Sequence, residues 1–415
     1  MNIKSFRAIT SIGSASGAQV VLLAALSLLL AKVLTVEEFG IIRVVTAYMI
    51  ILTMLGHFCL HDAVSTYVAR AKTDDEKANY IVGGSYLVLL ISIAVAVVFE
   101  VLIMGSALWT GRLKTTLAIM VLFLPMIALT LVYTSVLQSI GSYPKLAVAV
   151  VLGGAVPLLL IVPAATAWEL PGWIAGRSLS YVILLACGMM LLRDFLRPIK
   201  PPEEVYGKLM VFGRVQVVSG ILSMVMQSAD IIALERFGGA MSDVALYGLA
   251  ALFSRSVLFL PGAIGRVFFR EIAEGATQGA SWRPIAQLLM TVAGLCIALT
   301  VAMVLVVPTL IETLYSRVYA ASIPILRVMC LGIVFNGMWA ALSLINVAIN
   351  KPHFDVVISL IGASTSIALL FILVPHYGAI GAAWAMNAAY FVGSCIGLWL
   401  IYTENRKQTV VKTLR

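Results

Sequence analysis

Apolar stretches of about twenty residues, separated by short polar breaks, recur along almost the whole length of this chain. The hydrocarbon core of a bilayer is about 30 Å thick, and a helix needs roughly 20 apolar residues to cross it. Each such stretch is therefore predicted to be a membrane-spanning helix. Twelve are expected, at about residues 8–31, 41–67, 81–104, 115–138, 146–164, 173–192, 209–235, 246–267, 286–308, 324–349, 354–374 and 379–402.

The scarcity of charge points to the same class of protein. Charged residues make up 11% of the chain and hydrophobic residues 61%, whereas a soluble domain carries about a quarter charged residues. Such a chain cannot cover a water-facing surface, so we expect an all-α polytopic membrane protein. No loop between predicted spans exceeds about twenty residues. This leaves no room for a soluble catalytic domain, and the chain is not expected to be an enzyme.

The basic residues predict how the chain lies in the membrane. If the N-terminus is cytoplasmic, the cytoplasmic segments hold 18 of the 28 lysines and arginines. Short cytoplasmic loops are enriched in Lys and Arg, so both termini are predicted to be cytoplasmic. The net charge of +9 is then explained by topology and anionic lipid headgroups, and no nucleic-acid partner is expected.

The chain also resembles itself at an offset of 208 residues. At this offset polar and small residues coincide, and these matches are less common by chance than apolar ones. The pairs are Ser11 with Ser219, Gln19 with Gln227, Gly40 with Gly248, Ser135 with Ser343, Gln138 with Asn346, and Pro144 with Pro352. An internal duplication of this kind predicts two halves around a central cavity, although chance self-similarity of apolar sequence is an alternative.

The duplication defines the expected domains. They are an N-terminal six-helix bundle at 1–195, a proline-containing cytoplasmic linker at 196–208, a C-terminal six-helix bundle at 209–403 and a tail at 404–415. The five cysteines lie in or beside apolar stretches, without C-x-x-C spacing or a nearby histidine at ligand spacing. They are therefore expected to be apolar filler, and neither a metal nor a cofactor is predicted.

Polar side chains inside the predicted spans are the candidate site residues, because an ionisable group at mid-membrane usually faces a partner or a wet cavity. At 100° per residue, Arg43, His57 and His61 share one face of the second span. Arg255 lies deepest, whereas Arg177 and Arg327 lie near span ends, where snorkelling to the interface is the alternative. The complete candidate set is Arg43, Arg255, Gln19, Gln227, His57, His61, Asp230, Arg327 and Arg177.

Several of these residues have ordinary structural alternatives. Gln19 and Gln227 could join neighbouring helices, the histidines could be neutral packing residues, and Asp230 could pair with Arg236 or with a neighbouring span. If the arginines instead share a cavity without acidic partners, that cavity is cationic. Guanidinium groups bind phosphate as bidentate partners, so unpaired arginines here predict an anionic, phosphate-bearing ligand.

Four segments carry a resemblance to a known family. They are LAKVLTVEEFGIIRVVTAY, GHFCLHDAVSTYVAR, SADIIALERFG with the DVALYGLAALF that follows it, and VPHYGAIGAAWA. In these segments, and in span number and length, the chain resembles the Wzx-type polysaccharide (O-antigen) repeat-unit flippases of the multidrug/oligosaccharidyl-lipid/polysaccharide exporter superfamily. The chain lacks the two extra spans of the lipid II flippases. Its first span also lacks the acidic residue that many multidrug exporters use for cation coupling.

The resemblance implies a function and its partners. It implies two six-helix bundles around a V-shaped cavity, which alternate between inward-open and outward-open forms. The implied cargo is an undecaprenyl-diphosphate-linked oligosaccharide that moves from the cytoplasmic to the periplasmic leaflet, with Arg43 and Arg255 lining the lumen. Membrane lipid and the polymerase and chain-length proteins of glycan assembly are the expected partners. O-antigen, capsule and exopolysaccharide all stay open as products.

Three other functions stay open at this point. A cation-coupled multidrug antiporter would have the same architecture, although it would favour acidic residues within the spans. A membrane-embedded glycan polymerase or ligase would usually need a large external loop. A scaffold that transports nothing would gain little from the cost of buried charges.

Overall fold

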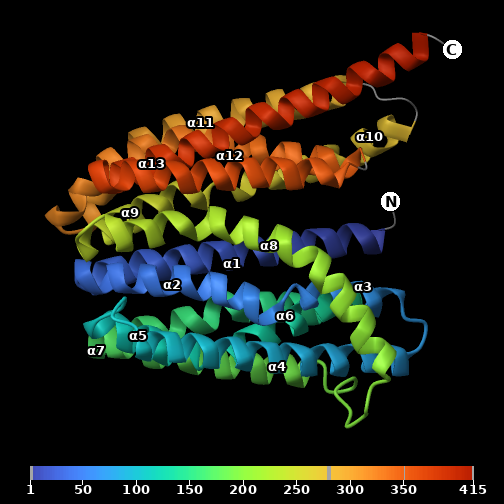
Figure 1. Ribbon diagram of the computed structural model, residues 1–415, viewed down its shortest axis with the longest axis horizontal. Coiled ribbons are helices and arrows are strands. Elements are labelled where there is room, and N and C mark those ends of the chain that lie inside the picture. The colour runs from blue at the N-terminus through green and yellow to red at the C-terminus, as the bar shows by residue number, and fades with distance from the viewer. Residues whose placement is uncertain (1–2, 278–281, 350, 414–415) are drawn as a thin grey trace. The chain divides into compact units, whose positions relative to one another are not determined.

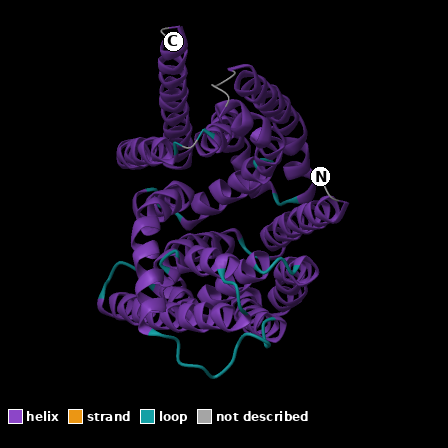
Figure 2. Cartoon of the chain, turned by 90° about the vertical axis from the view of Figure 1, so that its right-hand side faces the viewer, coloured by secondary structure: helices purple, strands orange, loops and turns teal. Residues whose placement is uncertain are grey.

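The computed structural model describes residues 3–277, 282–349 and 351–413, and every regular element in this part of the chain is a helix (Figures 1 and 2). In chain order the elements are α1 (Ile3–Val33), α2 (Val36–His57), α3 (Leu60–Arg70), α4 (Asp74–Gly105), α5 (Gly111–Val121), α6 (Leu124–Ser139), α7 (Tyr143–Leu191), α8 (Glu203–Phe237), α9 (Met241–Ser256), α10 (Phe259–Thr277), α11 (Trp282–Leu314), η1 (Arg317–Ala321), α12 (Ser322–Ala348) and α13 (Pro352–Thr413).

The helices are apolar enough to confirm a polytopic membrane protein. Among the described residues, seven helices are long and apolar enough to cross a bilayer, or nine if two bent pairs each count as one span. The bent pairs are α5 with α6, at 48°, and the two halves of α8, at 42°. The predicted count of twelve spans stays a prediction.

Local sequence explains where α2 and α4 begin. Thr35 accepts a hydrogen bond from the backbone N–H of Glu38 at 3.3 Å, and the Glu38 carboxylate accepts one from the N–H of Thr35 at 3.4 Å. This reciprocal capping box satisfies donors that the first turn of a helix leaves unpaired. Thr73 caps α4 by accepting from the N–H of Glu76 at 3.2 Å. Both caps follow short polar breaks, as expected.

Helix α7 folds back on itself. Trp168 and Glu169 leave the helical conformation, and Glu169 has a φ of 53°. A Cβ added to Gly176, in the second arm, would lie 2.8 Å from the Cα of Ile161 in the first arm. In one straight helix these residues would be about 22 Å apart at 1.5 Å per residue. The two arms of α7 therefore pack antiparallel, and they meet at the break predicted between the fifth and sixth spans.

Helix α13 turns in the same way at Gly378, where φ is 52°. A Cβ on Gly397, in its second arm, would lie 3.0 Å from the side chain of Ile358 in its first arm. The two arms are thus packed side by side. Glycine suits this turn because it adopts a positive φ without steric cost, and the turn falls in the break predicted at Pro375–Gly378.

The prediction of one straight helix over residues 41–67 is wrong. Helix α2 ends at His57 and α3 begins at Leu60. Between them Phe58 and Cys59 have φ of 48° and 54°, a left-handed conformation that costs roughly 1–2 kcal/mol per non-glycine residue. The Nδ1 atom of His57 accepts the N–H of Cys59 at 3.1 Å, which satisfies a backbone donor that the break would otherwise leave unpaired.

Helix α8 packs against this break through two glycines on one face, two helical turns apart. A Cβ on Gly213 would lie 2.9 Å from the carbonyl oxygen of Phe58, and a Cβ on Gly220 would lie 3.1 Å from the Sγ of Cys59. The absence of side chains at these positions lets the backbone of α8 come close to the strained segment. Tertiary packing therefore holds a conformation that the local sequence does not favour.

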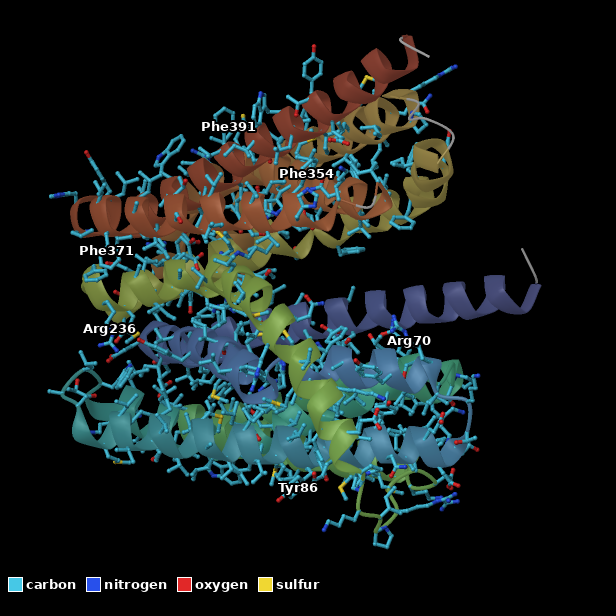
Figure 3. All side chains as sticks on the ribbon, turned by 45° about the vertical axis from the view of Figure 1, so that its right-hand side comes forward. Arg70, Tyr86, Arg236, Phe354, Phe371 and Phe391 are labelled. Atoms are coloured by element: carbon cyan, nitrogen blue, oxygen red, sulfur yellow. The ribbon has the colours of Figure 1, made fainter. Side chains whose placement is uncertain are left out.

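The chain divides into two compact units, Met1–Met224 and Val225–Arg415. The boundary falls inside α8, and the predicted linker at 196–208 lies in the first unit; the predicted division into two bundles stays a prediction. In the first unit, Leu60, Val88, Val136 and Leu209 are fully buried in one hydrophobic core. In the second unit, Phe237 at the end of α8 packs on Phe371 of α13, with ring centroids 5.1 Å apart (Figure 3).

Candidate functional site

The first unit contains a cavity of about 430 Å³, bounded by α1, α6 and both arms of α7. This volume is within the range of small-molecule binding pockets. Leu131 and Gln138 in its wall are exposed, so the cavity reaches the surface of the unit. Its polar lining residues are Gln19, Thr130, Thr134, Ser135, Gln138, Arg177, Ser180 and Tyr181. Among the described residues, no acid lines this cavity.

The geometry of the backbone places the amide of Gln19 at the cavity wall. Gly153, in the first arm of α7, lies so close to α1 that an added Cβ would be 2.8 Å from the Nε2 of Gln19. Gly154 would similarly bring a Cβ to 3.3 Å from the Cα of Gln19. These two glycines therefore provide the space in which a polar side chain of α1 reaches the cavity.

The hydroxyl groups of the lining are anchored to their own helices. Thr130 donates to the carbonyl of Met126 at 2.8 Å, and Thr134 donates to that of Thr130 at 3.0 Å. Ser180 donates to the carbonyl of Gly176 at 2.7 Å. A hydroxyl that donates one hydrogen bond still has oxygen lone pairs, so these groups can accept hydrogen bonds from hydroxyl-bearing ligands.

Arg177 supplies the cavity's positive charge and is held by Tyr181, one helical turn further on. Its Nε donates to the hydroxyl oxygen of Tyr181 at 2.8 Å, and its Cζ lies 4.9 Å from the centroid of that ring. The hydrogen bond and the cation–π contact fix the guanidinium plane. No carboxylate of the described residues forms an ion pair with Arg177. Its four terminal N–H donors therefore stay available to a ligand.

A second polar cluster surrounds Asp230 in the second unit. The Asp230 side chain is fully buried and accepts hydrogen bonds from the hydroxyl of Tyr247 at 2.5 Å and from the N–H of Ile231 at 2.9 Å. Arg255 forms an ion pair with the same carboxylate and also donates to the carbonyl of Gln227 at 3.0 Å. Within the structure this cluster pairs each buried charge with an opposite one.

This pairing corrects the expectation that Arg255 is an unpaired guanidinium. The sequence allowed Asp230 to form an ion pair either with Arg236 or with a residue of a neighbouring span. In the structure it pairs with Arg255 of α9. Arg236 instead contacts the carboxylate of Glu235 at 3.0 Å, near the end of α8 (Figure 3). Arg255 faces a cavity of only about 20 Å³, room for about one water molecule. Arg255 cannot bind a diphosphate in this arrangement.

The two histidines meet at the break between α2 and α3. The rings of His57 and His61 are 4.4 Å apart at an interplanar angle of 68°, and Nε2 of His61 lies 3.4 Å from the carboxylate of Asp62. Because Nδ1 of His57 accepts a hydrogen bond from the backbone, His57 is in the tautomer protonated on Nε2. The face that Arg43 shares with His57 ends at the break, so the expected continuous stripe through His61 is wrong.

The remaining candidates are not among the lining residues of the cavity in the first unit. Arg43 is half-buried on α2, Arg327 is exposed on α12, and the side chain of Gln227 is exposed on α8. Sequence reasoning missed Tyr181, which holds Arg177, and Tyr247, which donates to the carboxylate of Asp230. The four-residue spacing of Arg177 and Tyr181 would have been a usable signal, because residues at that spacing lie on the same helix face.

Comparisons with protein families and with solved structures identify a family and similar folds for this chain. Residues 6–269 match a family described as "Polysaccharide biosynthesis protein". The fold is similar to that of an inward-facing multidrug resistance MATE family transporter of the MOP superfamily. That comparison has a TM-score of 0.77 and 14% identity, covering 97% of this chain and 99% of the other.

The fold is also similar to the lipid II flippase MurJ in an inward closed conformation. The TM-score is 0.79 with 14% identity, covering 96% of this chain and 89% of the other. A MOP superfamily transporter from Pyrococcus furiosus gives a TM-score of 0.65 and 15% identity, covering 96% of this chain and 95% of the other. No curated protein sequence matches the chain. At these identities the structural similarity shows a shared fold.

Proposed function

The chain belongs to the polysaccharide biosynthesis protein family, and from this membership we propose that it is a lipid-linked oligosaccharide flippase. It moves undecaprenyl-diphosphate-linked repeat units from the cytoplasmic to the periplasmic leaflet of a bacterial inner membrane by alternating access. The oligosaccharide travels through protein while the polyprenyl chain stays in lipid. The chain acts as a carrier and makes or breaks no covalent bond.

The cavity in the first unit is the observation that carries this proposal. Its lining combines amides, hydroxyls and one guanidinium, without an acid among the described residues. Sugar hydroxyls need hydrogen-bonding partners when they leave water, and the lining of this cavity supplies them inside an otherwise apolar unit. A site for organic cations would need acidic residues instead. The lining therefore supports the oligosaccharide cargo over the multidrug alternative.

Arg43 and Arg255 keep their proposed roles towards the diphosphate, but under different conditions. Arg43 attracts the diphosphate directly. Arg255 contacts phosphate only in a state in which it has exchanged Asp230 for the ligand, since in the present arrangement its carboxylate partner occupies it. His57, His61 and Asp230 are the candidates for proton coupling. Arg327, which is exposed on α12, is a further candidate for binding the cargo.

Deletion and complementation test the proposal in cells. A strain without the gene should lose its surface polysaccharide, accumulate the lipid-linked repeat unit and recover both when the wild-type gene returns. Drug susceptibility is measured in the same strains. A strain with intact surface polysaccharide and increased drug susceptibility would contradict the proposal and would favour the multidrug antiporter.

A further inference from the structure

Polar residues that match at the offset of 208 residues have different surroundings in the two units. In the second unit, Ser343 donates to the carboxylate of Asp355 at 2.6 Å and Asn346 donates to it at 3.1 Å. Their counterparts Ser135 and Gln138 line the open cavity of the first unit. The counterpart of Asp355 is Ala147, so the first unit lacks the acid that satisfies these groups.

Four other polar residues of the cavity have no polar counterpart in the second unit, whereas Gln19 matches Gln227. At the same offset, apolar residues stand opposite these four lining residues. They are Met338 for Thr130, Leu342 for Thr134, Ala385 for Arg177 and Ala389 for Tyr181. A requirement of the shared fold would be expected in both units. The polar lining of the first unit is therefore better explained by a ligand than by packing.

The polar groups are arranged along the length of the cavity. Arg177 lies next to Gly176, which packs against Ile161, whereas Gln19 packs against Gly153. Residues 153 and 161 belong to one helical arm and are about 12 Å apart along its axis at 1.5 Å per residue. The backbone levels at which Arg177 and Gln19 face the cavity therefore differ by about that distance. A ligand that meets both groups carries an anion at one end and neutral hydrogen-bonding groups along its length.

The amount of positive charge indicates which anion fits. Arg177 is the single basic residue among the described residues that line the cavity. A diphosphate carries more than one negative charge, and one guanidinium would leave part of it uncompensated inside the membrane, where unpaired charge is costly. A carboxylate carries one charge, and its two oxygens match the bidentate fork of a guanidinium.

We propose that Arg177, oriented by Tyr181, binds the carboxylate of an acidic sugar in the transported repeat unit. Gln19 and the hydroxyls of α6 contact the neighbouring neutral sugars. This inference rests on the proposed function and names the class of glycan that the carrier selects. Arg177 is the specificity-determining residue, and Tyr181 is a positioning residue that acts through it.

Binding measurements in lipid nanodiscs test the inference with three probes. Two are undecaprenyl diphosphates that carry trisaccharides differing only in glucuronic acid or glucose at one position, and the third is undecaprenyl diphosphate without sugar. The proteins are wild type, Arg177→Gln, Arg177→Lys and Tyr181→Phe. The control is Arg193→Gln, because the Arg193 side chain is 84% exposed and lies beyond the cavity.

The wild-type protein and Arg193→Gln should bind the glucuronic acid probe about tenfold more tightly than the glucose probe, the factor expected for a charge-assisted hydrogen bond. Arg177→Gln should bind the two sugar probes about equally, because its main loss of affinity is for the glucuronic acid probe, while Arg177→Lys should keep part of the preference. Tyr181→Phe should reduce the preference, because the guanidinium loses the hydroxyl that orients it. If Arg177→Gln does not fold, the Tyr181→Phe variant still tests the inference.

Two results would overturn the inference. One is equal wild-type affinity for the acidic and neutral probes. The other is a loss of affinity in Arg177→Gln that is the same for all three probes, which would assign Arg177 to the diphosphate. Flipping of the same probes in liposomes separates the two proposals. A preference without flipping would refute only the flippase proposal, whereas flipping without preference would refute only this inference.

Discussion

Replacing Arg255 by alanine should destabilise the protein before it affects transport. The substitution leaves the carboxylate of Asp230 buried without its cation, and Asp230 is fully buried. Removing one partner of a buried ion pair costs about 3–5 kcal/mol. Tyr247 and the N–H of Ile231 still donate to the carboxylate, and 29% of the Arg255 side chain is exposed. We therefore expect the lower end of that range, about 3 kcal/mol.

The assay is unfolding by SDS titration in detergent micelles, followed by far-ultraviolet circular dichroism. Asp230→Asn combined with Arg255→Met should recover most of the lost free energy of unfolding, because it removes both charges. Arg197→Ala is the control, since Arg197 pairs with Asp75 at 3.3 Å on the surface, and such pairs contribute about 0–1 kcal/mol. The reasoning is refuted if Arg255→Ala unfolds like the wild type, or if the double substitution is as unstable as the two single effects added together.

Three further outcomes follow from the packing and the predicted topology. Gly213→Val should destabilise by about 1–3 kcal/mol through overpacking against the Phe58 carbonyl, whereas Gly207→Ala, which meets no atom within 4 Å, should be neutral or stabilising in the same SDS titration. Gly153→Val should push the Gln19 amide into the cavity and lower transport of lipid-linked glycan in liposomes, while the free energy of unfolding changes little; unchanged transport would remove this wall from the site. A green fluorescent protein fused to the C-terminus should fluoresce and an alkaline phosphatase fusion should be inactive, and the opposite pair of results would contradict a cytoplasmic C-terminus.

The helices were largely predictable because lipid imposes a simple length rule. The breaks at Thr35, Thr73 and Gly378 carry ordinary capping or glycine signals, and the structure turns or begins a helix at each. The break at Phe58 and Cys59 carries no such signal. Neither residue favours a left-handed conformation, and the close approach of α8 holds them there, so this break depends on tertiary packing that no local pattern records.

The candidate site was predicted only in part, for a related reason. The sequence shows that Gln19 and Arg177 are polar residues within predicted spans. They line the same cavity because α7 folds back and brings both of its arms beside α1 and α6. Arg255 was the cation predicted to lie deepest within a membrane span. Its pairing with Asp230 depends on how α8 and α9 are rotated about their axes, and apolar residues on all faces of these helices leave that rotation unspecified.

Reconstitution in liposomes tests the central claim most directly. Purified protein is incorporated into vesicles that contain an undecaprenyl-diphosphate-linked oligosaccharide, and an external glycosidase that cannot cross the bilayer digests whatever sugar reaches the outer leaflet. A lipid-linked oligosaccharide flippase should make the inner-leaflet pool accessible within minutes, compared with protein-free vesicles. An inner-leaflet pool that stays protected in vesicles containing folded protein would contradict the account.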